Sequence, residues 1–178
     1  MKRLNVLVMV TLLLLCSSAV RADITVGVSL PLTGPASGLG IPVGNYLKLW
    51  PKTLAGEKLN LIVLDDASDP SKGVANAKKL VTEDKADVIV GSALTPVAIA
   101  IAGVAADAQT PQLAVSPAAL PPGKDTWTFR LPQSTAVMAN ALIGHMKKQG
   151  IKTLGFLGYN DAYGESWLND FKAESEKL

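Results

Sequence analysis

The chain has few of the residues that catalysis commonly requires. Its 178 residues include one cysteine and one histidine. The histidine, His145, lies beside Lys147 and Lys148 in a segment with helical periodicity, which indicates a solvated helix face. Because no other histidine is present, a Ser-His or Cys-His nucleophile pair cannot be assembled elsewhere in the chain. The sequence also has no G-x-S-x-G motif and no phosphate-binding G-K-S/T loop. We therefore expect a protein that is not an enzyme.

Positive charge and aromatic side chains are also scarce beyond the first segment. Residues 1–22 hold three of the 17 basic residues and none of the 15 acidic ones, so the rest of the chain has a net charge of −1. A nucleic-acid-binding protein needs a basic face that neutralises phosphates. Nine aromatic residues are too few to indicate a base-stacking platform. Composition therefore argues against a nucleic-acid partner, whereas 48% hydrophobic and 18% charged residues favour a folded domain.

The first 22 residues have the three parts of a secretory signal peptide. Two basic residues at 2–3 precede an apolar run of eleven residues at 6–16, and small side chains lead to a cleavage position after Ala22. The run is shorter than the ~20 residues of a membrane span. We therefore expect residues 1–22 to be removed on export to the periplasm.

Cys16 raises an alternative, because a lipid can be attached to a cysteine that follows an apolar run. The bulky Leu15 before it stands where a small residue is expected, which weakens this alternative. If cleavage follows Ala22, the mature chain contains no cysteine. It then has neither disulfides nor thiol chemistry, although an exported protein could form disulfides.

Short apolar runs alternate with helical periodicity after residue 22. The sequence predicts strands at 24–30, 59–64, 87–90, 112–115, 126–131 and 154–157. It predicts helices at 74–81, 97–108 and 136–148. Strands that are apolar on both faces and alternate with helices indicate a parallel sheet covered on both sides. Ligand sites in such α/β sheets lie at the carboxyl ends of the strands.

Two loops carry motifs with a simpler structural explanation. Residues 38–40 form half of a dinucleotide fingerprint, but Val43 stands where a third glycine is required, which favours a pair of loop glycines. Asp65, Asp66 and Asp69 could hold a divalent cation. Asp69 precedes a proline, however, and more simply caps a helix. We therefore expect neither a cofactor nor a metal ion.

Thr95 and Pro96 are more informative, because they join the strand at 87–90 to the apolar helix at 97–108. Threonine is a favoured N-cap, and proline suits the first helical position. A buried helix that begins at the carboxyl end of a strand also presents free N–H groups and a positive dipole end to a carboxylate. From the residues alone, Thr95 is either a cap of its own helix or a carboxylate ligand.

Six motifs, each weak alone, occur together in a specific order. They are LTGP at 32–35, LDDASDP at 64–70, VIVGS at 88–92 leading to TP at 95–96, LAVSP at 113–117, TFR at 128–130 and GYNDAYGE at 158–165. Together they resemble the N-terminal part of the leucine/isoleucine/valine-binding type of periplasmic protein. These proteins are the type I solute receptors of branched-chain amino-acid ABC transporters. The resemblance extends over residues 24–178.

The resemblance implies an α/β, type I periplasmic-binding-protein fold with the doubly wound parallel sheet of lobe one. It places lobe one at 23–131 and the start of lobe two at 132–178. Members of the family are roughly twice as long, so the chain is expected to be truncated within lobe two. Such receptors close on a small solute without catalysis, and they act as monomers that deliver the solute to the permease subunits of the transporter.

The resemblance also implies part of a ligand site. Thr95 matches the position whose hydroxyl holds the solute's carboxylate, and Tyr163 matches the aromatic residue of lobe two that covers the solute. The positions that act through backbone atoms match Ala93, Ala118 and Ala119. Leu39 and Leu120 depart from the family, in which a tyrosine and a threonine commonly stand there.

These two leucines leave the solute class open. The family implies leucine, isoleucine, valine or a similar amino acid, whereas a more apolar pocket suits an aromatic or aliphatic acid without an amino group. Two further classes share the fold. A ligand-sensing domain would require a signalling segment downstream, and an enzyme on a doubly wound sheet would require a catalytic pair that this sequence lacks.

Overall fold

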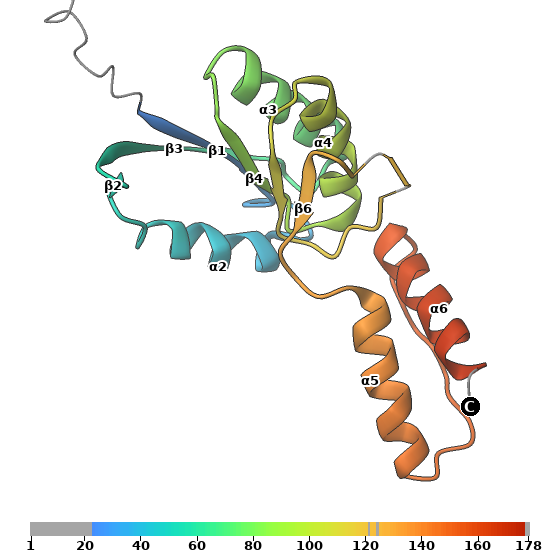
Figure 1. The fold of residues 1–178 in the computed structure, drawn as a ribbon. Helices are drawn as coiled ribbons and strands as arrows, with labels where there is room; N and C mark the ends of the chain where they lie inside the picture. Colours follow the sequence, from blue (N-terminus) through green and yellow to red (C-terminus); the bar gives the residue numbers. More distant parts are fainter. Residues whose placement is uncertain (1–22, 121, 124, 177–178) are drawn as a thin grey trace, which may run out of the picture.

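The computed structural model describes residues 23–120, 122–123 and 125–176. A six-stranded sheet with helices on both faces is followed by a pair of helices beside it (Figure 1). The expected signal peptide and Cys16 lie outside the described residues.

The strands lie in the order β2-β3-β1-β4-β5-β6. They are β1 (Ile24–Leu30), β2 (Thr53–Leu54), β3 (Glu57–Asp65), β4 (Val88–Gly91), β5 (Gln112–Ala114) and β6 (Thr128–Arg130). The short β2 is antiparallel to β3, and the other pairs are parallel. In the centre, Val28 is aligned with Val63 of β3 and with Val90 of β4. The prediction of a mostly parallel α/β sheet is confirmed.

Helices cover both faces of this sheet (Figure 1). On one side lies α2 (Ser37–Leu47), whose Leu47 is in one apolar cluster with Val28 and Leu30 of β1. On the other side lie α3 (Pro70–Thr82) and α4 (Thr95–Asp107). Ala77 of α3, Ile89 of β4 and Ile101 of α4 form the core there. The predicted doubly wound arrangement is therefore confirmed.

The capping prediction for Asp69 is also confirmed. Its carboxylate accepts hydrogen bonds from the N–H groups of Ser71 (2.7 Å) and Lys72 (3.0 Å), and Pro70 occupies the first turn. These bonds satisfy two N–H groups that a helix start leaves without an intrahelical partner. Asp69 therefore stabilises the start of α3, which begins four residues before the predicted range.

Helix α2 corrects the interpretation of Gly38 and Gly40 as loop residues. Both lie in the first turns of α2, and Pro42 follows inside the same helix. Glycine and proline lower helix propensity, so the pattern gave no helical signal. Close packing requires the glycine, because a Cβ on Gly40 would overlap the carbonyl oxygen of Pro31. Contact with the end of β1 thus overrides the local propensity.

The prediction of a strand at 154–157 is wrong. These residues have no regular secondary structure. A strand needs a neighbour to pair its backbone groups, and the described part of the chain after residue 131 contains no other strand. Phe156 instead contacts Phe171, with ring centroids 5.9 Å apart, whereas the side chain of Leu157 is exposed.

The helix pair consists of α5 (Thr135–Lys148) and α6 (Ala162–Ser175), which lie side by side (Figure 1). Ser134 caps α5 by accepting a hydrogen bond from the N–H of Val137. The two helices share a core of Ala139, Ile143 and Phe171.

The boundary of the lobes at 131/132 stays a prediction. No helix among the described residues has the length and apolar character that a membrane crossing requires.

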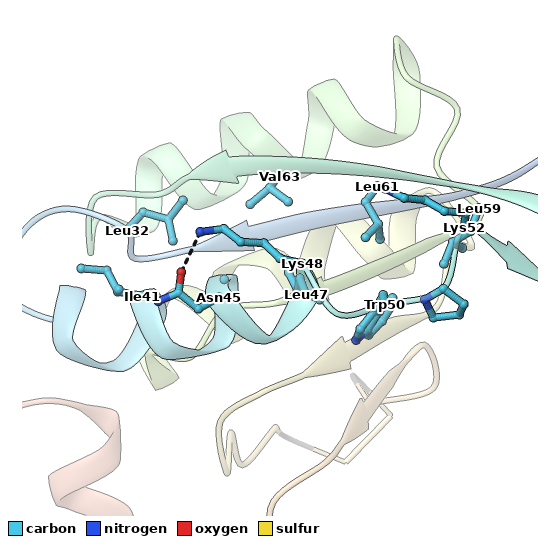
Figure 2. A pocket seen from close by; sticks show the side chains of 12 residues that line it. Leu32, Ile41, Asn45, Leu47, Lys48, Trp50, Lys52, Leu59, Leu61 and Val63 are labelled. Atoms are coloured by element: carbon cyan, nitrogen blue, oxygen red, sulfur yellow. Dashed lines mark hydrogen bonds between the residues drawn. The ribbon is translucent and has the colours of Figure 1, made fainter.

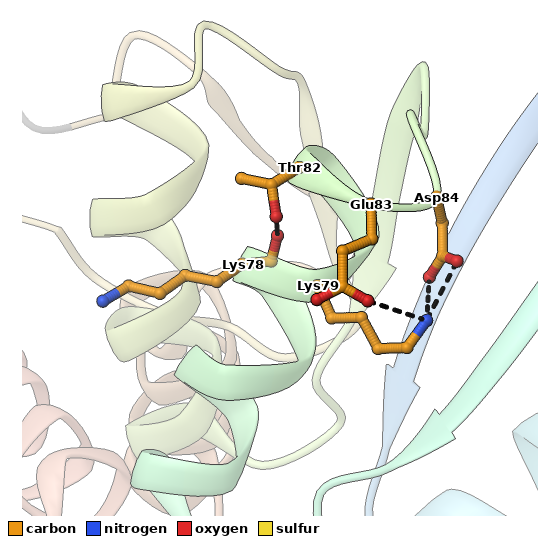
Figure 3. A network of polar contacts seen from close by, with 5 residues as sticks. All are labelled: Lys78, Lys79, Thr82, Glu83 and Asp84. Carbon is orange, nitrogen blue, oxygen red and sulfur yellow. Dashed lines mark hydrogen bonds and ion pairs between the residues drawn. The ribbon is translucent and has the colours of Figure 1, made fainter.

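A polar network joins the end of α3 to the turn before β4 (Figure 3). The Nζ of Lys79 lies 2.9 and 2.7 Å from the carboxylate oxygens of Asp84 and 3.9 Å from Oε2 of Glu83. The hydrogen bond to Asp84, more than the charges of Asp84 and Glu83, raises the pKa of Lys79 above 10.5 despite some desolvation. The network therefore stabilises the fold below pH 10.5, and this contribution disappears as the pH rises through the higher folded-state pKa.

We expect Lys79→Met to lower the melting temperature slightly at pH 7, because a half-exposed ion pair is screened by solvent. The difference from the wild type should vanish above the raised pKa. The control is Lys78→Met, because the Lys78 side chain extends away from the network (Figure 3). Melting curves from pH 7 to 11.5 measure both variants. A Lys79 difference that persists at the highest pH would contradict the ionic explanation.

Candidate functional site

A cavity of about 610 Å³ lies at the carboxyl ends of the parallel strands, between the sheet and the start of α6. Its walls come from the loops after β1, β3, β4 and β5 and from the turn before α6. The lining residues are Pro35, Ala36, Gly38, Leu39, Ser68, Ala93, Leu94, Thr95, Pro117, Tyr159, Asp161 and Tyr163. This is the edge of the sheet at which α/β proteins bind ligands.

Four of the seven predicted site residues line this cavity, and three do not. The lining includes Leu39, Ala93, Thr95 and Tyr163. The other three follow Pro117 in the chain: Ala118 is buried in a cluster with alanines of α4 and β5, Ala119 is exposed and Leu120 is partly buried. The ligand roles of all seven residues stay predictions.

Thr95 does not cap its own helix, so that alternative is wrong. The N-cap of α4 is Leu94, and no side chain caps this helix end. Thr95 is the first residue inside the helix, where its backbone is already helical. Just before the helix, the N–H of Leu94 donates a hydrogen bond to the Oγ of Ser92 (3.3 Å). The Thr95 hydroxyl therefore lies at the cavity without a capping role.

The start of α4 presents a backbone donor in the same place. Helix geometry leaves the first N–H groups without an intrahelical acceptor. Pro96 has no N–H, Ala98 bonds to the carbonyl of Leu94, and Val97 is fully buried and does not line the cavity. The N–H of Thr95 therefore remains, and the positive end of the helix dipole adds to it. This end of the cavity is suited to a negatively charged group.

Aromatic side chains form the opposite wall. Asp161 caps α6 by accepting hydrogen bonds from the N–H groups of Tyr163 (2.9 Å) and Gly164 (3.0 Å), which fixes Tyr163 in the first turn. The rings of Tyr159 and Tyr163 have centroids 6.5 Å apart, and Tyr163 meets Trp167 edge-on at 6.4 Å. An apolar or aromatic solute can pack against these rings.

Buried polar side chains lie beneath the cavity, and Asp66 is at their centre. Its carboxylate accepts hydrogen bonds from the hydroxyls of Ser92 (2.8 Å) and Ser29 (3.3 Å) and from the N–H of Ser68 (3.0 Å). Burial raises the pKa of Asp66 above its ordinary value. The three hydrogen bonds act in the opposite direction, and the nearby charge of Asp65 adds to the rise. Sequence analysis did not identify this role. The available signal was a small polar residue at the end of each strand.

Asp65 has a different environment. Burial favours a higher pKa, but hydrogen bonds from the Thr33 hydroxyl and from the N–H groups of Ala67, Thr33 and Leu32 lower the pKa of Asp65 below its ordinary value. The carboxylate therefore fixes the loop after β1 to the end of β3. Among the described residues, no group of three or more His, Cys, Asp or Glu side chains is placed to hold a metal ion.

Ser68 and Tyr159 are lining residues that the sequence analysis missed. The Oγ of Ser68 accepts a hydrogen bond from the N–H of Ala36 (3.0 Å) and donates one to the carbonyl of Thr33 (3.2 Å). It thereby joins the loop after β3 to the loop after β1. Ser68 lies within the LDDASDP motif, so its place after a strand was the signal that could have found it.

A second, apolar groove lies between α2 and the face of β3 (Figure 2). Leu59, Leu61 and Val63 form its floor along the strand. Two of its polar side chains, Lys48 and Asn45, bond to each other at 2.8 Å. The groove extends along β3 instead of lying at the carboxyl edge, and it has no helix start. It is therefore the weaker candidate for a ligand site.

Known proteins resemble this chain over nearly all of the residues after position 22. The sequence model of the family described as "Periplasmic binding protein" matches residues 23–178. Leu/Ile/Val-binding protein homolog 3 of Brucella melitensis is 32% identical, over 90% of this chain and 46% of that protein. The chain thus spans about half the length of the curated relatives it matches.

Solved structures agree with the sequence comparison. An extracellular ligand-binding receptor from Rhodopseudomonas palustris HaA2 is 44% identical, with a TM-score of 0.85 over 88% of this chain and 44% of that chain. A solute binding protein of an ABC transporter from Rhodopseudomonas palustris BisB5, in complex with 3,4-dihydroxy benzoic acid, is 29% identical. Its TM-score is 0.78 over 87% of this chain and 44% of that chain. The predicted resemblance is thereby confirmed, and the chain belongs to the periplasmic binding protein family.

Proposed function

We propose that this chain forms the first lobe, and the beginning of the second, of a receptor that captures a small carboxylate-bearing solute in the periplasm. The receptor acts as a monomer, without catalysis, and delivers its solute to the permease of an ABC transporter. One observation carries the proposal most. The start of α4 and two tyrosines from the turn before α6 and from its first turn face one cavity.

The polar groups of the cavity favour a carboxylate over a cation or a neutral solute. The hydroxyl and the N–H of Thr95 are donors at the positive end of a helix. The only carboxylate among the lining residues, that of Asp161, is engaged in capping α6. A charged partner at a partly buried helix start contributes up to ~2 kcal/mol. An anionic end of the solute is therefore expected at Thr95.

Two solute classes fit this end of the cavity. Leucine, isoleucine or valine is the expectation from the family, and their side chains would pack against Leu39 and Tyr163. An aromatic acid is the second candidate, because Pro35, Pro117 and two tyrosine rings supply flat apolar walls. The relative solved with 3,4-dihydroxy benzoic acid supports this second class.

A calorimetric titration tests the proposal. The chain is titrated with leucine, isoleucine, valine and 3,4-dihydroxybenzoate, and then with leucinamide and 3,4-dihydroxybenzamide as matched controls that lack the carboxylate. We expect at least one acid to bind about tenfold or more tightly than its amide, because the amide loses the charge-assisted hydrogen bonds. Fluorescence of Trp167, which contacts Tyr163, gives a second measurement. Equal affinity for acid and amide, or no binding of any acid, would contradict the proposal.

A further inference from the structure

The polar layer beneath the cavity has a regular arrangement. Ser29 near the end of β1, Asp66 after β3, Ser92 after β4 and Ser116 after β5 are all buried. A buried polar side chain destabilises a fold unless it is hydrogen-bonded, and an apolar residue at these positions would avoid that cost. The repeated use of polar residues at four adjacent strand ends indicates a role other than filling the core.

Asp66 connects this layer to both walls of the cavity. On one side, its Oδ2 accepts from the hydroxyl of Ser92, and the Oγ of Ser92 accepts from the N–H of Leu94, the residue before α4. On the other side, its Oδ1 accepts from the N–H of Ser68, and the Oγ of Ser68 holds the N–H of Ala36 before α2. One carboxylate thus fixes the start of α4 and the loop that faces it.

We propose that Asp66 is a positioning residue of the solute site, which sets the direction of the first N–H groups of α4 through Ser92 and Leu94. The inference rests on the proposed function of the cavity. Asp66 does not line the cavity and does not touch the solute; it acts through the residues that do. Thr95 then meets the solute in a geometry fixed before binding, which avoids part of the cost of ordering it.

An amide replaces this carboxylate only in part. The two oxygens of Asp66 accept three hydrogen bonds. An asparagine keeps the bond from the Ser68 N–H only if its NH₂ group faces the hydroxyls of Ser92 and Ser29, which must then accept instead of donate. Asp66→Asn therefore keeps the size of the side chain and replaces the hydrogen bonds to a carboxylate by the weaker ones to an amide.

The test compares Asp66→Asn and Ser92→Ala with the control Asp87→Asn. Asp87 also joins β1 to β4, since its Oδ2 accepts from the N–H of Thr25 at 2.8 Å, but at the opposite end of these strands. Calorimetry with leucine and 3,4-dihydroxybenzoate, well below each melting temperature, measures affinity. Hydrogen exchange of the amides at 92–98, without solute, measures the order of the helix start.

We expect Asp66→Asn and Ser92→Ala to weaken the affinity about tenfold and to raise exchange at 92–98 about tenfold. Asp87→Asn should change neither, even where its melting temperature falls. Affinity within twofold of the wild type in a folded Asp66→Asn or Ser92→Ala would overturn the inference. If the wild type binds neither probe, the proposed function fails and exchange decides alone: a selective rise at 92–98 supports the role of Asp66, and unchanged exchange overturns it.

Discussion

Thr95→Val is expected to weaken the binding of a carboxylate solute about tenfold to a hundredfold. The substitution keeps the branched shape and removes the hydroxyl, and a hydrogen bond to a charged group contributes ~1.5–3 kcal/mol. Binding should not vanish, because the N–H of Thr95 and the positive end of the helix dipole remain. Calorimetric titration measures the change against the wild type.

The same variant should leave the free energy of unfolding nearly unchanged. Thr95 does not cap α4, so its hydroxyl is not needed to start the helix. Thr82→Val is a matched control, because its hydroxyl donates to the carbonyl of Lys78 within α3, away from the cavity. It should not affect affinity. Unchanged affinity together with a lowered melting temperature in Thr95→Val would assign Thr95 a structural role only.

Gly91→Ala is expected to destabilise the fold strongly. Gly91 ends β4, is aligned with Ser29 of β1 and has a φ of 131°, a conformation that residues with a Cβ rarely adopt. A Cβ there would also overlap the carbonyl oxygen of Ser29. Because backbone atoms cannot move aside cheaply, we expect a loss of ~3 kcal/mol or more in the free energy of unfolding.

Gly103→Ala is the matched control for this variant. Gly103 lies exposed in α4, and a Cβ there would meet no atom within 4 Å. Alanine in a helix interior should raise the stability by ~0.5–1 kcal/mol. Urea denaturation measures the free energy of unfolding of both variants. It should fall in Gly91→Ala and rise in Gly103→Ala if close packing at the end of β4 causes the Gly91 effect. Equal changes in the two variants would contradict this explanation.

The sequence predicted the elements in which one strong local signal sufficed. The cap of α3 was identified because Asp69 and the proline after it are both local signals, although the apolar periodicity placed the helix only at 74–81. The apolar runs at 24–30 and 87–90 identified the central strands. Helix α2 could not be predicted this way, since Gly40 is placed by contact with Pro31, a residue of the preceding loop. The strand predicted at 154–157 failed for the same reason, because pairing depends on a neighbour.

The candidate site was predictable only in part. Position at a strand end identified Thr95, because parallel strands bring their carboxyl ends to one edge. The capping alternative could be excluded only from the structure, where the helix begins at Thr95 itself and Leu94 is its N-cap. Asp66 had no single local signal. Its role appears only when Ser29, Ser68 and Ser92, from three other positions in the chain, meet its carboxylate.

The most direct test of the central claim is a crystal structure of the chain with a bound solute, either leucine or 3,4-dihydroxybenzoate. We predict a carboxylate oxygen about 3 Å from the Thr95 hydroxyl oxygen, with the rest of the solute between Leu39 and Tyr163. A solute seated in the groove between α2 and β3 (Figure 2), or one with its carboxylate directed away from the start of α4, would contradict the account.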